Sequence, residues 1–339
     1  MDAGSEDLRR ARGMTLPARS IRLALLALLA ALGAAPAFAL DYPTRPITLI
    51  VSHKPGGPSD VIARILGRML GQVLRQPLVI ENRPGAGGNI AGEQAAQATA
   101  DGYTLLMGNT GILATNPARQ KDIGFNPQLD FAPITLIGTQ ANALVVNPAL
   151  PAMTLTQLIE LARAKPGLIT FASAGHGSPS HLAGELFKTA TKTRLVHVPY
   201  QKPAPALQDV IGGHVQMMFA PAALVANHVR AGRLRVLGVA TDKRSALMPG
   251  VATLDELGLS GFDATTWYGL VAPAGTPKEI IDVLYHSTAT ALEDPAARKI
   301  MSGLGIDVVA SSPREFEAYI KTQIPKWGAV IKSIVTHTH

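Results

Sequence analysis

Short apolar runs alternate with helix-like segments along this 339-residue chain, and this alternation constrains the fold more than any other feature. The strand-like run 47–51 leads into a loop at 53–60 and then into a segment with apolar residues at helical spacing. The same order recurs at 78–98, and another strand-like run follows at 103–107. Strands and helices that alternate with short connections favour sheets with helices on their faces. We therefore predict an α/β fold with mainly parallel sheets flanked by helices.

The length of the chain predicts two lobes, because one hydrophobic core rarely organises about 300 residues. Further strands are expected at 143–146, 169–172, 195–198, 215–220, 234–240 and 268–272. Helices are expected to begin near Thr154, Ser180, Ala204, Ala223 and Ala252, and to occupy 277–293, 295–303 and 313–334. Those last helices have no sheet of their own, so the chain is expected to return to the first lobe. We predict lobe 1 from 40–140 plus 266–339 and lobe 2 from 141–265, with a hinge of two crossing strands.

The first 39 residues have the pattern of a secretory signal peptide. Five arginines precede an apolar run at 23–32, and Ala37-Phe38-Ala39 has the A-x-A form of a signal-peptidase site. The run is shorter than the roughly 20 residues that span a bilayer, which disfavours the alternative of a retained membrane anchor. We predict cleavage after Ala39 and a product in the periplasm, with translation starting at Met1 or Met14.

Charge and composition restrict the partners. Without the signal peptide, whose five arginines outnumber three acidic residues, the net charge falls from +7 to +5. No run of Lys or Arg exceeds two residues and only 5% of residues are aromatic, so we expect no nucleic-acid partner. The chain has no cysteine, which excludes disulfides, thiol nucleophiles and thiolate metal sites. A small anionic solute suits the mild positive charge.

The loops at 53–60, 108–111 and 173–180 each follow a predicted strand, where ligands bind in sheets of this kind. The stretch 171–185, FASAGHGSPSHLAGE, is the most informative of them. Its small side chains let a ligand oxygen approach the backbone closely. We also expect several of its backbone N–H groups to lack partners at the start of a helix, where the helix dipole favours negative charge. This loop is therefore predicted to hold a carboxylate with neutral donors.

Long motifs run in order through the mature chain: YPTRPITLIV, PGGPSD, IENRPGAGGNIAGE, ADGYTLLMGN, FAPITLI, ASAGHGSPSHLAGELFK, VHVPYQKPAPALQDVIGGHVQMMF, GRLRVLGVAT, WYGLVAPAGTP and PKWGAVIK. They resemble the Bug-type family of solute-binding receptors of tripartite tricarboxylate transporters, over about residues 42–335. The resemblance implies a two-lobe periplasmic binding protein fold of type 2 that closes on a small organic carboxylate. It also implies delivery to the permease subunits of a membrane transporter. The open alternative is a ligand sensor that docks on a sensor kinase. We expect a monomer without cofactor or metal.

Ligand-binding residues are predicted on both lobes. From lobe 1, including the second of the two strands expected to cross between the lobes, they are Pro55, Gly56, Gly57, Ser59, Asp60, Asn109, Thr110 and Trp267. From lobe 2 they are Ser173, Gly175, His176, Gly177, Ser178, Tyr200 and Ala220. At position 220 relatives often carry Asp, so alanine there argues against an amino-acid ligand.

Each of several candidates has a structural alternative. The alternative role of Asp60 is to cap the helix that follows it. Trp267 and Tyr200 would alternatively pack in a core, and His176 would alternatively face solvent. Lys54, at the expected cleft mouth, would favour a dianion if it contacts the ligand, or is an ordinary solvated lysine.

The sequence lacks the enzyme signatures that its motifs superficially suggest. A dinucleotide fingerprint over 85–90 needs glycine where Ile90 stands, and neither a Walker A motif nor G-x-S-x-G occurs. Ser178 is close in sequence to His176 and His181, which alone does not make a catalytic triad. His181 and Glu185 lie one helical turn apart but lack the HExxH pattern, and Glu185 is expected to face solvent or a capping partner. We predict a binding protein that is not an enzyme.

Overall fold

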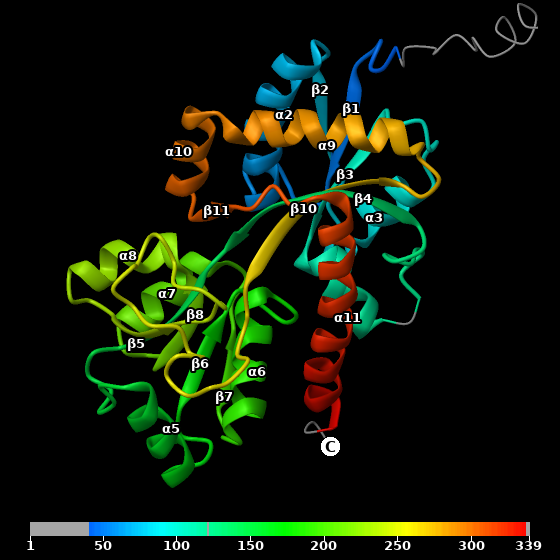
Figure 1. Cartoon of the computed structure of the whole chain (residues 1–339). Helices are drawn as coiled ribbons and strands as arrows, with labels where there is room; N and C mark the ends of the chain where they lie inside the picture. The colour runs from blue at the N-terminus through cyan, green and yellow to red at the C-terminus, as the bar shows by residue number, and fades with distance from the viewer. Residues whose placement is uncertain (1–40, 121, 337–339) are drawn as a thin grey trace, which may run out of the picture. The chain divides into compact units, whose positions relative to one another are not determined.

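The computed structural model describes residues 41–120 and 122–336. The predicted signal peptide and its cleavage site lie outside the described residues. Within those residues, no helix is both long enough and apolar enough to cross a membrane. The described chain forms two β-sheets with helices around each (Figure 1).

The first sheet has six strands in the order β11-β4-β10-β3-β1-β2. Their bounds are β1 Ile47–Val51, β2 Leu78–Asn82, β3 Thr104–Asn109, β4 Phe131–Gln140, β10 Thr266–Pro273 and β11 Ile306–Val308. In β1, Ile47 and Leu49 lie in one apolar core and Ile50 lies in another, because successive strand residues point to opposite faces. Both faces of this strand are buried, which explains why its sequence is apolar almost throughout.

The second sheet has five strands in the order β7-β6-β8-β5-β9. Their bounds are β5 Asn142–Val146, β6 Thr170–Ser173, β7 Val196–Pro199, β8 Met217–Pro221 and β9 Arg235–Val239. The parallel strands β7, β6 and β8 place their carboxyl ends at one edge of the sheet. The loop at 174–178 emerges at this edge, directly after β6.

The prediction of mainly parallel sheets is wrong, because only four of the nine strand pairings are parallel. Each antiparallel pairing includes β4, β5 or β10, the strands next to the places where the chain passes between the sheets. The chain leaves the first sheet through β4 and returns through β10, so these two neighbours run in opposite directions. β5 likewise pairs antiparallel with both β8 and β9.

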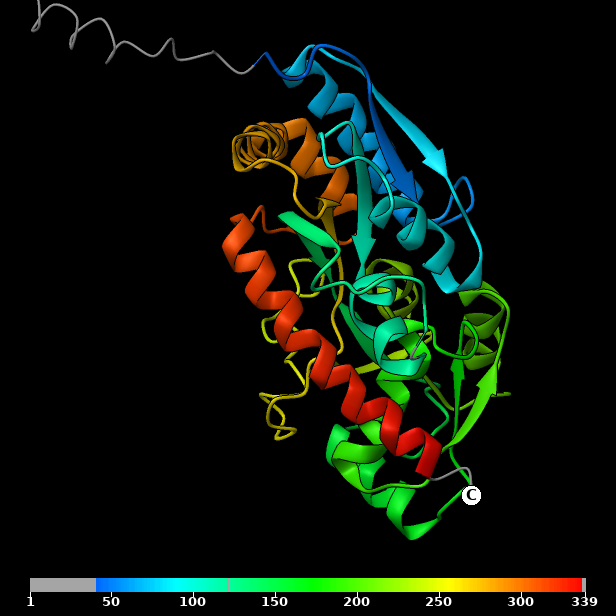
Figure 2. The same ribbon diagram turned by 90° about the vertical axis from the view of Figure 1, so that its right-hand side faces the viewer.

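The helices cover the two sheets separately, with one exception. The helices α2 Pro58–Leu74, α3 Asn89–Ala96, α9 Lys278–Glu293 and α10 Pro295–Gly303 contact strands of the first sheet. Near the second sheet lie α5 Leu155–Ala164, α6 Pro179–Thr191, α7 Pro203–Ile211 and α8 Ala222–Arg230. The exception is α11, Pro313–Thr336, which contacts both β4 and α6 and so links the surroundings of the two sheets (Figure 2).

The two chain crossings between the sheets are tied together by one side chain. Asn142, just after the β4 crossing, donates from Nδ2 to the carbonyl of Ala264 at 2.8 Å and to Oγ1 of Thr266 at 3.1 Å. Ala264 in turn donates its backbone N–H to Ala240 at 2.9 Å. The two crossings are therefore held side by side where the sheets meet.

Several elements differ from the sequence-based expectation, among them the short helix α4, Asn116–Arg119, which was not predicted. The strands β4 and β11 were not predicted, and the helix expected from Ala252 is a series of turns. Thr253 and Glu256 do form a reciprocal pair of side-chain bonds to backbone N–H, as at a helix start. Gly258, with φ of +101°, then takes a conformation that ends helical growth after one turn.

Candidate functional site

A cavity of about 450 Å³ lies between loops that follow strands of both sheets. Larger hollows of about 660 and 570 Å³ lie elsewhere, the first around 64–80 and the second around 185–195. Each of those is lined by a single short region of the chain, whereas the cavity is lined by residues far apart in sequence. Its lining is His53, Pro58, Gly87, Asn109, Thr110, Gly111, Asn116, Arg119, Gln140, Asn142, Ala174, His176, Gly177, Ser178, Pro179, Ser180, Pro203, Met218, Pro221, Thr266 and Tyr268.

The lining of this cavity is suited to an anion. None of the described residues that form it is acidic, whereas Arg119 brings a permanent positive charge. Its other polar groups are hydroxyls, amides and two imidazoles, all of which can donate hydrogen bonds. Electrostatics therefore favour a negatively charged ligand over a cation or an ammonium compound.

Arg119 is the last residue of α4, Asn116–Arg119. Its guanidinium lies next to two glycines, Gly87 and Gly177, which come from different loops. A methyl group built on Gly177 would lie 2.6 Å from Nη1, and one built on Gly87 would lie 3.5 Å from Nη2. Gly177 also has φ of +75°, so a side chain there would be both strained and in the way of the arginine. Within the described part of the chain, Arg119 forms no ion pair with a carboxylate.

The loop at 174–178 is fixed by its own hydrogen bonds. Four of its backbone N–H groups donate locally: Ala174 to Ser180 Oγ, Gly175 to Ser173 Oγ, Gly177 to His181 Nδ1, and Ser178 to the Gly175 carbonyl, at 3.0 to 3.1 Å. Ser178 also caps α6 by accepting the N–H of His181 at 3.3 Å. The expectation of several unpartnered amides is wrong for these four. The loop is instead rigid, and His176, Gly177 and Ser178 line the cavity.

The loop after β3 lines the cavity and is hydrogen-bonded to β10, the strand through which the chain returns to the first sheet. Asn109 accepts the N–H groups of Gly111 at 2.8 Å and Ile112 at 3.2 Å, which turns the chain directly after the strand. Thr110 accepts the N–H of Trp267 through Oγ1 at 3.0 Å. Asn109 and Thr110 both line the cavity, as the sequence suggested; their contact with a ligand stays a prediction.

Trp267 lies on the opposite face of β10 from the cavity. It is fully buried and packs edge-on against Phe316 and Tyr319 of α11, with ring centroids 5.8 and 5.5 Å away. Its neighbours Thr266 and Tyr268 line the cavity instead, because strand residues alternate in direction. Burial raises the pKa of Tyr268, so its hydroxyl stays protonated and able to donate a hydrogen bond.

In the loop at 53–60, His53 and Pro58 line the cavity, and hydrogen bonds to Asp60 hold the loop in place. The buried Asp60 carboxylate accepts from the Gly56 N–H at 2.8 Å, from Arg64 Nε at 2.9 Å and from Asn82 Nδ2 at 2.8 Å. Burial alone would raise the pKa of Asp60, but these hydrogen bonds and the Arg64 charge hold it below its usual value. Asp60 therefore organises the loop. The expectation that it caps the helix is wrong, because Asp60 lies inside α2 and Gly57 is at the N-cap position.

Most of the other candidates from this loop and from lobe 2 are also placed outside the cavity lining. They are Pro55, Gly56, Gly57, Ser59, Ser173, Gly175, Tyr200 and Ala220. Ser173 and Ala220 are fully buried in strands, and the Tyr200 hydroxyl bonds the Asp209 carboxylate. The lining residues that sequence reasoning missed include Asn116, Arg119, Gln140, Asn142, Thr266 and Tyr268.

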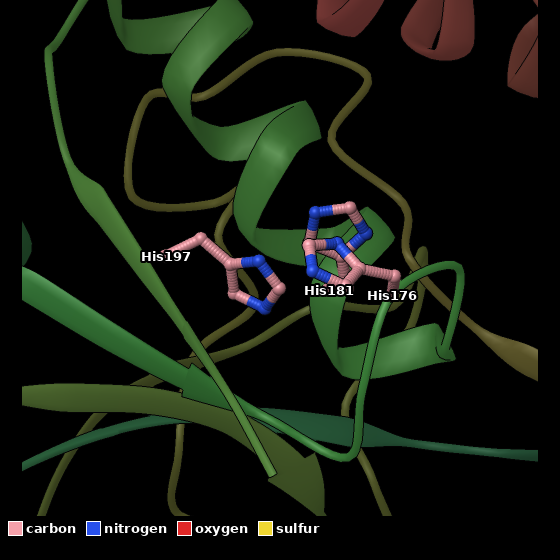
Figure 3. Close-up of side chains that lie close together, drawn as sticks. All are labelled: His176, His181 and His197. Atoms are coloured by element: carbon pink, nitrogen blue, oxygen red, sulfur yellow. The ribbon is translucent and has the colours of Figure 1, made fainter.

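Three histidines meet behind the 174–178 loop (Figure 3). His176 comes from the loop, His181 from the first turn of α6 and His197 from β7. The His181 and His197 rings lie 4.1 Å apart, and His176 meets both rings edge-on at 5.4 and 5.0 Å. Burial lowers the pKa of His181 to about 3 and of His197 to about 4, with neighbouring positive charges adding to the effect. Both rings are therefore neutral near pH 7.

Residues 62–335 match the model of a protein family, the tripartite tricarboxylate transporter family receptor. Among curated proteins, the chain is 37% identical over 300 residues to Protein BugT of Bordetella pertussis, covering 88% of this chain and 92% of that one.

Two similar solved structures contain a bound acid. R. palustris Rpa4515 with adipate is 34% identical, with a TM-score of 0.74, over 86% of this chain and 98% of that one. MatC from Rhodopseudomonas palustris with bound malate is 30% identical, with a TM-score of 0.72, over 86% of this chain and all of that one. The two-lobe α/β fold expected from the sequence is thereby confirmed.

Proposed function

The chain belongs to the tripartite tricarboxylate transporter receptor family, and from this premise we propose that it is a periplasmic receptor for a small dicarboxylate. The observation that carries the proposal is the cavity with an unpaired Arg119 and no acidic residue among its described lining. Adipate and malate, bound by two relatives, are both dicarboxylates. The pattern of the first 39 residues supports export to the periplasm.

In this proposal one carboxylate of the ligand binds near the Ser178 end of α6, and the other pairs with Arg119. The start of α6 contributes the positive end of a 13-residue helix. Arg119 presents a planar fork of donors that matches a carboxylate. Asn109, Thr110 and His176 then lie close enough to complete the contacts, since all three line the same cavity. The ligand recognised in this way is a small dianion.

Ligand capture is proposed to close the two lobes, taken as 40–140 plus 266–339 and 141–265. Because loops from both lobes line the cavity, a ligand that contacts both stabilises the closed arrangement. The proposed hinge is the pair of crossings between the sheets, and the hydrogen bonds of Asn142 across them support this proposal. The closed receptor would then present its ligand to the permease subunits of the transporter. No step in this cycle requires the protein to act as an enzyme.

A thermal-shift screen of the purified protein tests the proposal. Adipate, malate and other dicarboxylates should raise the melting temperature by several degrees, because a ligand at 100 times its Kd adds about 2.7 kcal/mol of stability. Acetate, amino acids and diamines at equal concentration are the controls and should raise it less. A melting temperature that no organic acid changes would contradict carboxylate binding.

A further inference from the structure

Of the three histidines behind the 174–178 loop, the proposed carboxylate binding uses only His176, and it gives no role to the buried His181 or to His197. One nitrogen from each of His176, His181 and His197 lies within 4.8 Å of one nitrogen from each of the others. We propose that this histidine cluster is a binding site for a divalent transition-metal ion of the Zn²⁺ or Co²⁺ type. Imidazole nitrogens suit these ions, and three imidazoles with one open position are a common ligand set for them.

The hydrogen bonds of His181 leave its lone pair on the nitrogen that faces the loop. Its Nδ1 accepts the N–H of Gly177 at 3.1 Å, so the proton of the neutral ring is on Nε2. Nε2 lies 3.7 Å from the Glu185 carboxylate. A carboxylate behind the outer nitrogen is the usual support for a metal-bound histidine. An ion at Nδ1 replaces one backbone hydrogen bond and requires no proton to leave the ring.

His197 is held in a matching way by Ser173. The Ser173 hydroxyl donates to the Gly175 carbonyl at 3.2 Å and accepts the Gly175 N–H at 3.1 Å. In the tautomer in which the hydroxyl donates to Gly175, Ser173 accepts from His197 Nε2 at 2.6 Å. The lone pair of His197 is then on Nδ1, and no described group occupies this nitrogen. Two of the three rings are thus oriented by partners outside the cluster, as expected for a metal site.

His176 is the exposed member that would complete the site. Bound nitrogens lie about 2.0–2.1 Å from zinc, so three of them must approach to about 3.4 Å from one another. His181 is buried and His197 is half-buried, whereas the His176 side chain is exposed on the loop and can rotate toward the other two rings. His176 also lines the cavity, so the fourth metal position is open to water from that side.

The charges around the cluster permit a cation. Lys188 is the positive group beside His181, but its Nζ is paired with both oxygens of Glu185, at 2.9 and 2.7 Å. Glu185 itself is 6% exposed, which corrects the expectation that it faces solvent. The glutamate offsets the lysine charge, and the three rings are uncharged ligands. The described charge that still opposes a bound ion is that of Arg119, which lies against Gly177.

Titration with Co²⁺ tests the metal site directly, because its visible absorption reports coordination geometry. The full chain should first carry His337→Ala and His339→Ala, which remove the two histidines at its C-terminal end. In this background we expect one Co²⁺ per chain, with the intense absorption of a four-coordinate ion, and displacement by one equivalent of Zn²⁺. His176→Ala should weaken Co²⁺ binding at least tenfold.

His286→Ala is the matched control, because His286 is exposed on α9, away from the cluster; it should bind Co²⁺ as the background does. Circular dichroism on each variant verifies that the fold is retained. His197→Phe provides a second test by removing a ligand from a strand rather than from the loop, and it should also weaken binding. The proposal is overturned if the background binds no stoichiometric Co²⁺, or if His176→Ala binds it as tightly as the background.

Discussion

Replacing Arg119 with glutamine should weaken dicarboxylate binding by about 10- to 150-fold. A charge-assisted hydrogen bond contributes about 1.5–3 kcal/mol, and each 1.4 kcal/mol is a factor of ten in Kd. The glutamine keeps a polar group near Gly177 but removes the only permanent positive charge of the described cavity lining. A monocarboxylate of similar length has no second anionic group to lose, so its Kd should change less than about threefold. Calorimetric titration of both acids measures this difference.

Two further variants sharpen the test of Arg119. Arg119→Lys keeps the charge without the planar fork, so its dicarboxylate affinity should fall between those of the parent and the glutamine variant. Lys54→Gln removes a lysine that is exposed and outside the cavity lining, and should leave both affinities unchanged. The sequence-based suggestion that Lys54 selects for dianions would be favoured instead if Lys54→Gln had the larger effect. Equal losses for both acids in Arg119→Gln would contradict the assigned role of Arg119.

Replacing Trp267 with alanine should lower the free energy of unfolding by about 3–5 kcal/mol, the usual cost of truncating a buried Trp. The indole is fully buried, and it joins β10 to the Phe316 and Tyr319 rings of α11. Its removal leaves a cavity that these two rings cannot fill without moving. Urea unfolding followed by circular dichroism gives the free energy directly.

The control variants for Trp267 separate packing from polar effects. Trp267→Phe keeps an aromatic ring and removes Nε1, which has no hydrogen-bond partner among the described residues. It should therefore cost clearly less than alanine. Leu129→Ala changes a side chain that is 70% exposed and should stay within about 0.5 kcal/mol of the parent. A loss below about 1 kcal/mol for Trp267→Ala would show that this residue is not part of the core.

Most strands and helices could be predicted from the sequence, although β4, β11 and α4 were not, whereas the side chains that line the cavity often could not. Trp267 and Tyr268 show why. A crossing strand buried on both faces has no polar alternation to mark which side meets the ligand. Only its pairing with β3 and β4 sets the direction of each residue. A one-residue difference in register exchanges the core and cavity faces.

The polar loops show a second limit of sequence patterns. The small residues of 173–180 were expected to admit a ligand oxygen, which stays a prediction; in the structure the Arg119 side chain lies against Gly177. The composition of this stretch did not reveal that the Ser173 and Ser180 hydroxyls and the His181 ring would bond the loop's own amides. Arg119 itself lies on a four-residue helix after a wide turn. No periodic pattern in so short an element indicates that its last side chain enters a cleft.

Hydrogen exchange with and without a saturating dicarboxylate tests most directly whether the acid binds between the two sheets. Binding should slow exchange in 108–116 and 174–180 together, since these segments come from different sheets and line one cavity. The hollow around 64–80 should show no change. Protection confined to one of the two loops, or found only at 64–80, would contradict a ligand held between the lobes.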